Sequence, residues 1–135
     1  MIKAPFSGLY DPIPDTGEYL SRIGFSGVIG NDVETLGRLM RAHMQRVPFE
    51  NLEVFFEKRE PNLSTAALFE KIVTNRRGGY CFELNGLFSR LLSSLGFSVS
   101  LFFARVVKGG FLSPPSHEVL CIEAEGKRYF CDVGF

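Results

Sequence analysis

A cysteine behind two glycines is the residue in this sequence with the clearest chemical potential. Cys81 lies in the segment RGGYCFELN at 77–85, and His117 and Asp132 follow later in the chain. The glycines interrupt the chain just before an apolar run at helical spacing, which predicts that Cys81 begins a helix. A thiol, an imidazole and a carboxylate that are distant in sequence are the groups that nucleophilic acyl transfer requires. We therefore take these three residues as candidate catalytic residues.

Position at a helix start does not by itself make Cys81 reactive. A helix N-terminus is worth at most ~2 kcal/mol, or about 1.5 pKa units, whereas a Cys–His ion pair lowers a thiol pKa by roughly 4–5 units. Cys81 therefore needs His117, and a carboxylate on the second ring nitrogen would fix the tautomer. On residue types alone, a small cysteine packed at a helix start is an equally good interpretation.

The last part of the sequence predicts a β-hairpin that brings the other two residues together. If 125–126 is a two-residue turn, Ala124 pairs with Lys127, and His117 and Asp132 become diagonal neighbours. Diagonal partners lie roughly 7–8 Å apart, so an imidazole and a carboxylate can close that gap to a hydrogen bond. A three-residue loop would shift the register and separate them.

The same register places Cys121 on the face of His117 and Cys131 on the other face, so we expect no disulfide between them. Both faces of the hairpin carry apolar residues, which predicts that both are covered and that both thiols are buried and inert. The sequence contains three cysteines and no Cys-x-x-Cys spacing. We therefore expect no metal site.

The candidate residues are surrounded by segments with helical spacing of apolar residues and by segments typical of strands. Helical spacing predicts four helices, and the later alternating or β-branched stretches predict three strands joined by a loop and a tight turn. Helices followed by strands indicate an α+β fold, with an N-terminal helical bundle over residues 1–95 and an incomplete antiparallel β-barrel or sheet over 96–135. The predicted helices are 18–23, 33–47 with Asn31 and Glu34 as a capping box, 65–75 with Ser64 as N-cap, and 81–95; the predicted strands are 97–107, 116–124 and 127–133, with a loop at 108–115.

Composition narrows the class of partner. The chain has 135 residues, 45% of them hydrophobic, and a formal net charge of +0 with scattered Lys and Arg. A nucleic-acid or anionic-membrane binder would carry a basic patch, so we expect a small neutral or organic partner and neither nucleic acid nor membrane. The N-terminus lacks the apolar core of a signal peptide, which predicts a cytoplasmic protein.

Five segments carry a resemblance to a known family. They are YLSRIG at 19–24, PFENL at 48–52, the Cys81 segment at 77–85, His117, and DVGF at 132–135. Together they resemble the N-terminal half of an arylamine N-acetyltransferase. The resemblance implies a cysteine-protease-like Cys-His-Asp site, with Cys81 as the acetylated nucleophile, His117 as general acid-base and Asp132 as its orienting partner.

The family chemistry implied is a ping-pong cycle through an acetyl-Cys81 thioester. Acetyl-coenzyme A would be the co-substrate, and the nitrogen of an arylamine or arylhydrazine the acceptor. By the same resemblance Phe135 would line the acceptor pocket, and the loop with Gly110, Ser113 and Ser116 would lie near coenzyme and acceptor. For the two serines, an ordinary role in capping a turn is as good an interpretation.

Two further residues are implied to support the site. Glu50 and Arg77 resemble an ion pair that ties the Pro48 segment to the loop before Cys81; the alternative is two solvated charges worth ~0–1 kcal/mol. His43 lies on the apolar side of its helix, which favours a packed residue over a ligand.

The family continues beyond the point that matches Phe135, through the rest of a β-barrel and a C-terminal lid. We expect a chain of this length to be a fragment, or to complete its sheet by forming an oligomer through open strand edges. Three functions remain open: a thiol acetyltransferase, intact or impaired by truncation, a related amide-forming acyltransferase with a larger acyl donor, and a non-catalytic interaction module.

Overall fold

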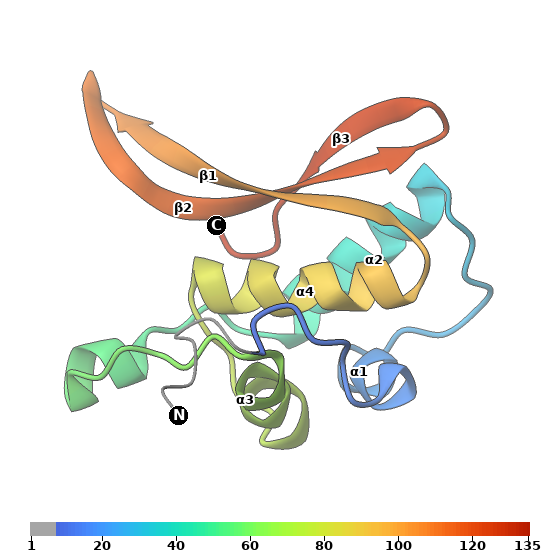
Figure 1. The fold of residues 1–135 in the computed structure, drawn as a ribbon, viewed down its shortest axis with the longest axis horizontal. Helices are drawn as coiled ribbons and strands as arrows, with labels where there is room; N and C mark the ends of the chain where they lie inside the picture. The colour runs from blue at the N-terminus through green and yellow to red at the C-terminus, as the bar shows by residue number, and fades with distance from the viewer. Residues whose placement is uncertain (1–7) are drawn as a thin grey trace, which may run out of the picture.

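The computed structural model describes residues 8–135 and has the predicted α+β order, with helices before a three-stranded antiparallel sheet (Figure 1). Within these residues no helix is both long and apolar enough to cross a lipid bilayer. The helices are α1 Thr16–Arg22, α2 Val33–Arg46, α3 Thr65–Phe69 and α4 Cys81–Ser94, with π-helical turns η1 Glu53–Glu57 and η2 Glu70–Thr74, and the strands are β1 Ser98–Lys108, β2 Phe111–Ala124 and β3 Lys127–Cys131.

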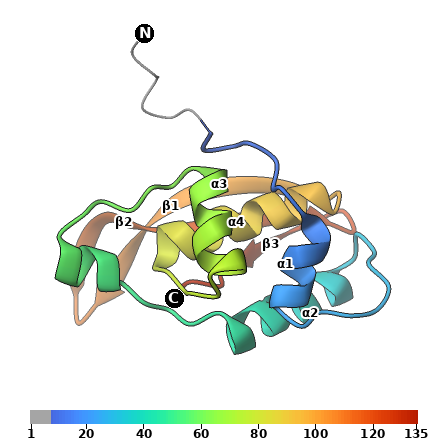
Figure 2. The same ribbon diagram turned by 90° about the horizontal axis from the view of Figure 1, so that it is seen from below.

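Helix α4 is the centre of the molecule. One side of it packs against the sheet, and α1 and α3 cover the opposite side (Figures 1 and 2). Apolar residues all round a helix indicate a buried one, and Leu84, Phe88 and Leu91 are fully buried against Leu120 and Ile122 of β2. Helices and sheet thus share one core, and a division at residue 95 into two domains stays a prediction.

The helix ends follow from local chemistry. Ser64 caps α3 as predicted, because its Oγ accepts a hydrogen bond from a backbone N–H of the first turn. At α2 the predicted capping residue is wrong by one position: Asp32, not Asn31, accepts from the N–H of Thr35 at 2.7 Å. The Asn31 side chain instead donates to the carbonyl of Gly96, the residue that ends α4 with a φ of +92°.

The predicted loop at 108–115 is wrong. Only Gly109 and Gly110 form the turn between β1 and β2, and both have positive φ. Pro114 and Pro115 lie inside β2, although proline removes a ladder hydrogen bond. They are tolerated because this part of β2 pairs with β1 on one side only, and because the register shifts here, leaving Ser116 as an extra residue.

The second hairpin has the predicted register. Ala124 pairs with Lys127, and the turn residues Glu125 and Gly126 have φ values of 51° and 72°. Positive φ at both positions matches the right-handed twist of the flanking strands. After Cys131 the chain turns beneath the sheet toward α4 (Figure 1).

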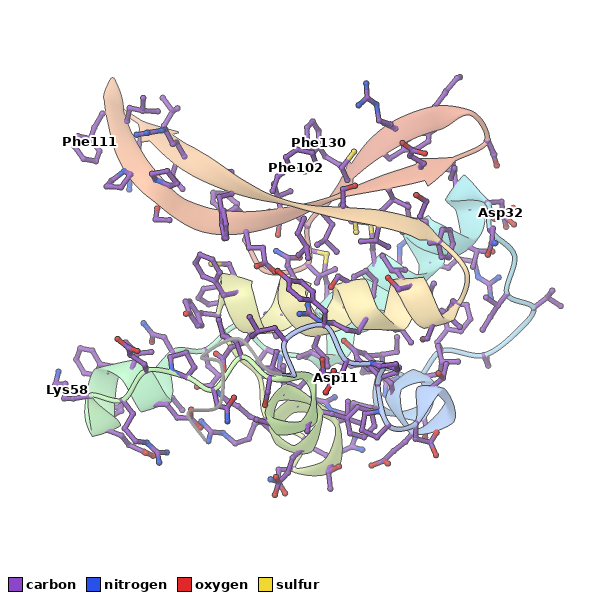
Figure 3. All side chains as sticks on the ribbon, viewed as in Figure 1. Asp11, Asp32, Lys58, Phe102, Phe111 and Phe130 are labelled. Atoms are coloured by element: carbon purple, nitrogen blue, oxygen red, sulfur yellow. The ribbon has the colours of Figure 1, made fainter. Side chains whose placement is uncertain are left out.

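The prediction that both hairpin faces are covered is also wrong. Phe102 and Phe130 lie on the side of the sheet that faces away from α4, and Phe130 is 78% exposed (Figure 3). Cys121 lines an open groove on this side and is half-buried, whereas Cys131 is fully buried on the inner face. All three cysteines are free, and burial raises the pKa of the Cys131 thiol to about 12.

Candidate functional site

Cys81 is the first residue of α4, as predicted. The turn that delivers it is closed by Glu83, whose Oε2 accepts a hydrogen bond from the N–H of Tyr80 at 2.9 Å. This carboxylate satisfies a backbone donor that has no partner within the helix. The thiol therefore sits on a fixed first turn, and its residue is 6% exposed.

The two glycines before Cys81 allow a close backbone approach. Gly79 donates to the carbonyl of Pro48 at 3.3 Å, and the N–H of Glu50 donates to Gly79 at 2.9 Å. A Cβ on Gly78 would lie 1.8 Å from the Pro48 carbonyl oxygen, so no larger residue fits. The glycines therefore let the Pro48 segment pack against the turn that carries Cys81, in addition to bending the chain.

Arg77 and Glu50 form the predicted ion pair at 3.0 Å, as part of a larger network. Arg77 also reaches Glu53 at 3.0 Å, and Lys71 lies 2.5 Å from Glu83 and 3.5 Å from Glu53. Lys71 Nζ and Glu50 are 3.7 Å apart. The carboxylate that caps α4 is thus linked through Lys71 to the residues that hold the preceding loop.

Arg22 fixes the same loop from behind, a role that sequence reasoning missed. Its buried guanidinium donates to the carbonyls of Ile72 at 2.8 Å and Arg46 at 2.7 Å. It also donates to Arg76 and Arg77 at 3.3 Å each. These contacts join the end of α2 and the middle of η2 to the chain that leads into Cys81.

His117 and Asp132 are hydrogen-bonded, as the hairpin register predicts. The ring Nε2 lies 2.6 Å from Asp132 Oδ2. The other carboxylate oxygen accepts from Asn85 Nδ2 and from the N–H of Gly134, each at 2.9 Å. An Nε2–H donating to this carboxylate leaves Nδ1 as the basic nitrogen of the neutral ring.

Asn85 links this pair to the helix that carries the thiol. It lies one helical turn after Cys81 and is fully buried. Its Nδ2 also donates to the carbonyl of Glu118 at 2.7 Å, and its Oδ1 accepts from Val133 at 2.9 Å. A Cβ on Gly134 would lie 2.9 Å from Cys81 Cα, so the chain after Asp132 packs directly on the turn that carries Cys81. The helical spacing of Asn85 from Cys81 is the sequence feature that could have identified it.

The thiol lies beside the strand that carries His117. Cys81 Sγ donates a hydrogen bond to the carbonyl of Ser116 at 3.8 Å, a contact that a thiol can make and a thiolate cannot. Burial raises the pKa of Cys81, while backbone N–H groups of Glu118 and Phe82 act in the opposite direction. Burial therefore opposes ionisation of the Cys81 thiol, and among residues 8–135 no hydrogen bond joins Cys81 Sγ to the His117 ring.

The other predicted site residues divide into two groups. Phe135 joins the site, with its ring 5.0 Å from the His117 ring in an edge-on arrangement, and Ser116 contributes its carbonyl. Ser113 Oγ instead accepts from the N–H of Val106 at 2.8 Å, which is a bond between β2 and β1 and not the capping of a turn. Gly110 lies at the tip of the β1–β2 hairpin, roughly 20 Å of strand from His117, near the labelled Phe111 in Figure 3.

His43 is a packed residue, as expected. It is fully buried, its Nε2 lies 3.0 Å from the hydroxyl of Tyr19, and burial lowers its pKa to about 3. In the part of the chain from Gly8 onward, no three His, Cys, Asp or Glu side chains form a group that could hold a metal ion. The expectation of no metal stays a prediction.

Comparison with known proteins places this geometry in a family. A family model described as N-acetyltransferase matches residues 32–135. The arylamine N-acetyltransferase of Escherichia coli K12 is 42% identical over 124 residues, which is 90% of this chain and 44% of that protein. The chain belongs to the arylamine N-acetyltransferase family.

Solved structures of arylamine N-acetyltransferases have the same fold. The enzyme from Salmonella typhimurium superposes with a TM-score of 0.85 at 39% identity, covering 93% of this chain and 46% of that one. The Mycobacterium marinum enzyme in complex with CoA has a TM-score of 0.79 at 36% identity, covering 89% and 46%. The chain thus spans less than half the length of these relatives.

Proposed function

We propose that Cys81 carries an acetyl group from acetyl-coenzyme A to the nitrogen of an arylamine or arylhydrazine. The observation that supports this most directly is the 2.6 Å His117–Asp132 hydrogen bond, which Asn85 anchors to the helix that begins at Cys81. An imidazole hydrogen-bonded to a carboxylate, beside a helix that begins with a thiol, supports assigning the three groups as base, orienting carboxylate and nucleophile. Membership of the family supports the choice of donor and acceptor.

In the first half of the cycle, His117 Nδ1 takes the proton of the Cys81 thiol, and Sγ attacks the carbonyl carbon of the acetyl thioester. The tetrahedral intermediate collapses by breaking the bond to the coenzyme sulfur, which leaves with the proton that His117 held. Asp132 stabilises the transient imidazolium without taking its proton. The product is an acetyl-Cys81 thioester.

In the second half, the amine nitrogen attacks the thioester carbonyl and gives a proton to His117. Collapse of this intermediate expels the Cys81 sulfur, which recovers the proton. Both intermediates carry an oxyanion that needs preorganised donors. The backbone N–H of Cys81 is one candidate, because N–H groups in the first turn of a helix have no partner within it.

The proposal is tested by intact mass after mixing the protein with acetyl-coenzyme A. We expect one acetyl adduct on the wild type and on Cys121→Ala, which removes the half-buried thiol of the outer sheet face, and none on Cys81→Ala. An adduct that survives in Cys81→Ala would refute the assignment of the nucleophile. Faster acylation by a longer acyl-coenzyme A than by the acetyl donor would favour the related amide-forming acyltransferase.

If the wild type forms no adduct, selective alkylation decides between the remaining functions. Labelling of Cys81 faster than Cys121 near neutral pH would support an assembled nucleophile with an incomplete coenzyme site. Equally slow labelling of all three thiols would refute the proposed function and leave a non-catalytic module.

A further inference from the structure

Lys71 of η2 lies where three carboxylates from different segments meet. Its Nζ is 2.5 Å from Glu83 Oε1 at the start of α4, 3.5 Å from Glu53 Oε2 and 3.7 Å from Glu50 Oε1. An ammonium group has three donors, so this one group can serve all three carboxylates. The Lys71 side chain is 11% exposed, and the proposed chemistry gives it no role.

Glu83 is the carboxylate that depends most on Lys71. It is 2% exposed, and among residues 8–135 no other lysine or arginine forms an ion pair with it. Glu50 and Glu53 each have a second cation, because Arg77 lies 3.0 Å from both. A buried charge that loses its partner is strongly unfavourable. Without Lys71, the Glu83 carboxylate would therefore take up a proton or turn toward solvent.

The second oxygen of Glu83 holds the turn that carries Cys81. Glu83 Oε2 accepts from the N–H of Tyr80 at 2.9 Å, and this N–H has no partner within the helix. The same side chain packs on the preceding residue, since a Cβ on Gly79 would lie 2.8 Å from Glu83 Cβ. The two oxygens of one carboxylate thus connect Lys71 to the backbone directly before the nucleophile.

A cavity beside the ion pair gives the carboxylate room to move. Lys71 and Glu83 both line this space of about 540 Å³. Arg59 is the other cation in the lining, but its side chain is 67% exposed and pairs with Glu57 at 2.5 Å. The remaining charged residues of the lining are glutamates, which repel a carboxylate. Lys71 is therefore the group that keeps Glu83 in its capping position.

We propose that Lys71 is a positioning residue for the nucleophile: its ammonium keeps the Glu83 carboxylate in its capping position and so fixes the turn that carries Cys81. The inference rests on the proposed function, in which Cys81 attacks an acyl group. It requires Lys71 only while residue 83 is charged. A glutamine at position 83 accepts the same N–H through its amide oxygen and needs no cation.

The test uses p-nitrophenyl acetate, a small activated ester that does not need a coenzyme site. Cys81 Sγ forms the bond to the acetyl carbon, the bond from that carbon to p-nitrophenolate breaks, and His117 takes the thiol proton and passes it to water. Peptide mass over time gives the rate constant of acetylation at Cys81. Each rate constant is divided by the fraction of the variant that circular dichroism shows to be folded.

We expect Lys71→Met to slow acetylation of Cys81 about tenfold, which is within the range for coupled residues of one charge network. Adding Glu83→Gln to Lys71→Met should bring the rate back to within about twofold of the wild type, because the capping acceptor returns without a buried charge. Lys127→Met, the same change at an exposed position, should alter the rate by less than about twofold.

The double variant Lys71→Met/Glu83→Leu separates positioning from stability. An apolar pair in place of a buried ion pair is often at least as stable, but leucine cannot accept the N–H of Tyr80. This variant should therefore be folded and as slow as Lys71→Met. If Lys71→Met does not fold, the comparison of the two double variants decides in its place.

A wild-type rate in folded Lys71→Met, or equal rates in the two double variants, would overturn the inference and leave the proposed function intact. A glutamine double variant as slow as Lys71→Met would also overturn it, because Lys71 would then act by a route other than Glu83. If the wild type is acetylated at Cys121 as fast as at Cys81, the proposed function itself fails, and the inference fails with it.

Discussion

Replacing Asn85 with alanine tests whether one side chain holds the site together. The change removes hydrogen bonds to Asp132, to the Glu118 carbonyl and from Val133, all around a fully buried residue. Each neutral bond contributes about 1 kcal/mol and the bond to the carboxylate about 2 kcal/mol, so the expected loss is about 4 kcal/mol. A domain of this size is stable by only about 5–15 kcal/mol.

The assay is urea unfolding followed by circular dichroism, with Asn51→Ala as the control because Asn51 is exposed. We expect the control to change the free energy of unfolding by less than about 0.5 kcal/mol. In the folded fraction of the Asn85→Ala variant, the rate of Cys81 acetylation should also fall, because Asp132 loses one of the two donors to its Oδ1. A loss below about 1 kcal/mol with unchanged acetylation would refute the view that Asn85 joins α4 to the His117–Asp132 pair.

Three further changes have expected outcomes. Asp132→Asn should lower the acetylation rate by roughly 10³-fold or more with the fold retained, because the ring loses its orienting carboxylate; a time course of intact mass measures this. Gly78→Ala should destabilise by more than about 3 kcal/mol in thermal unfolding, because its Cβ meets the Pro48 carbonyl, whereas Gly37→Ala, with open space around it, should gain up to about 1 kcal/mol. Glu118 is an acid whose pKa is raised on folding from 4.5 to about 7, so stability should fall by at most about 3 kcal/mol as pH rises through that window. Urea unfolding at several pH values should show this slope in the wild type and its loss in Glu118→Gln.

Local sequence rules predicted most elements because the competing alternatives were weak. Ser64 caps a helix whose next residues follow at helical spacing, and the turn at 125–126 fixed a register that placed His117 against Asp132. The rules failed at Pro114 and Pro115, which normally end a strand. Whether a proline is tolerated depends on which side of the strand is paired, and that is a property of the whole sheet.

The site itself was predictable only in part. The Cys81 segment and the hairpin identified the candidate reactive groups, since each depends on residues that are close in the sequence. Arg22 escaped because its partners are carbonyl groups of distant segments, which no side-chain pattern in the sequence records. Asn85 was missed although its helical spacing from Cys81 was visible in the sequence, because its bonds to Asp132 and Val133 depend on how the hairpin packs on α4. The pKa of Glu118 is raised because the side chain is buried against α4. The alternation of inward and outward residues along β2 suggests this burial but does not give its extent.

The loop before Cys81 is held by two sets of contacts that differ in their response to acid. Glu50 and Glu53 hold Arg77 by charge, and that hold weakens when carboxylates are protonated. Arg22 holds the same loop through carbonyl oxygens alone, which do not titrate. Acidification therefore weakens the contacts of Glu50 and Glu53 with Arg77 and leaves those of Arg22 unchanged, so the path of the chain into Cys81 is retained after the carboxylate charges are lost.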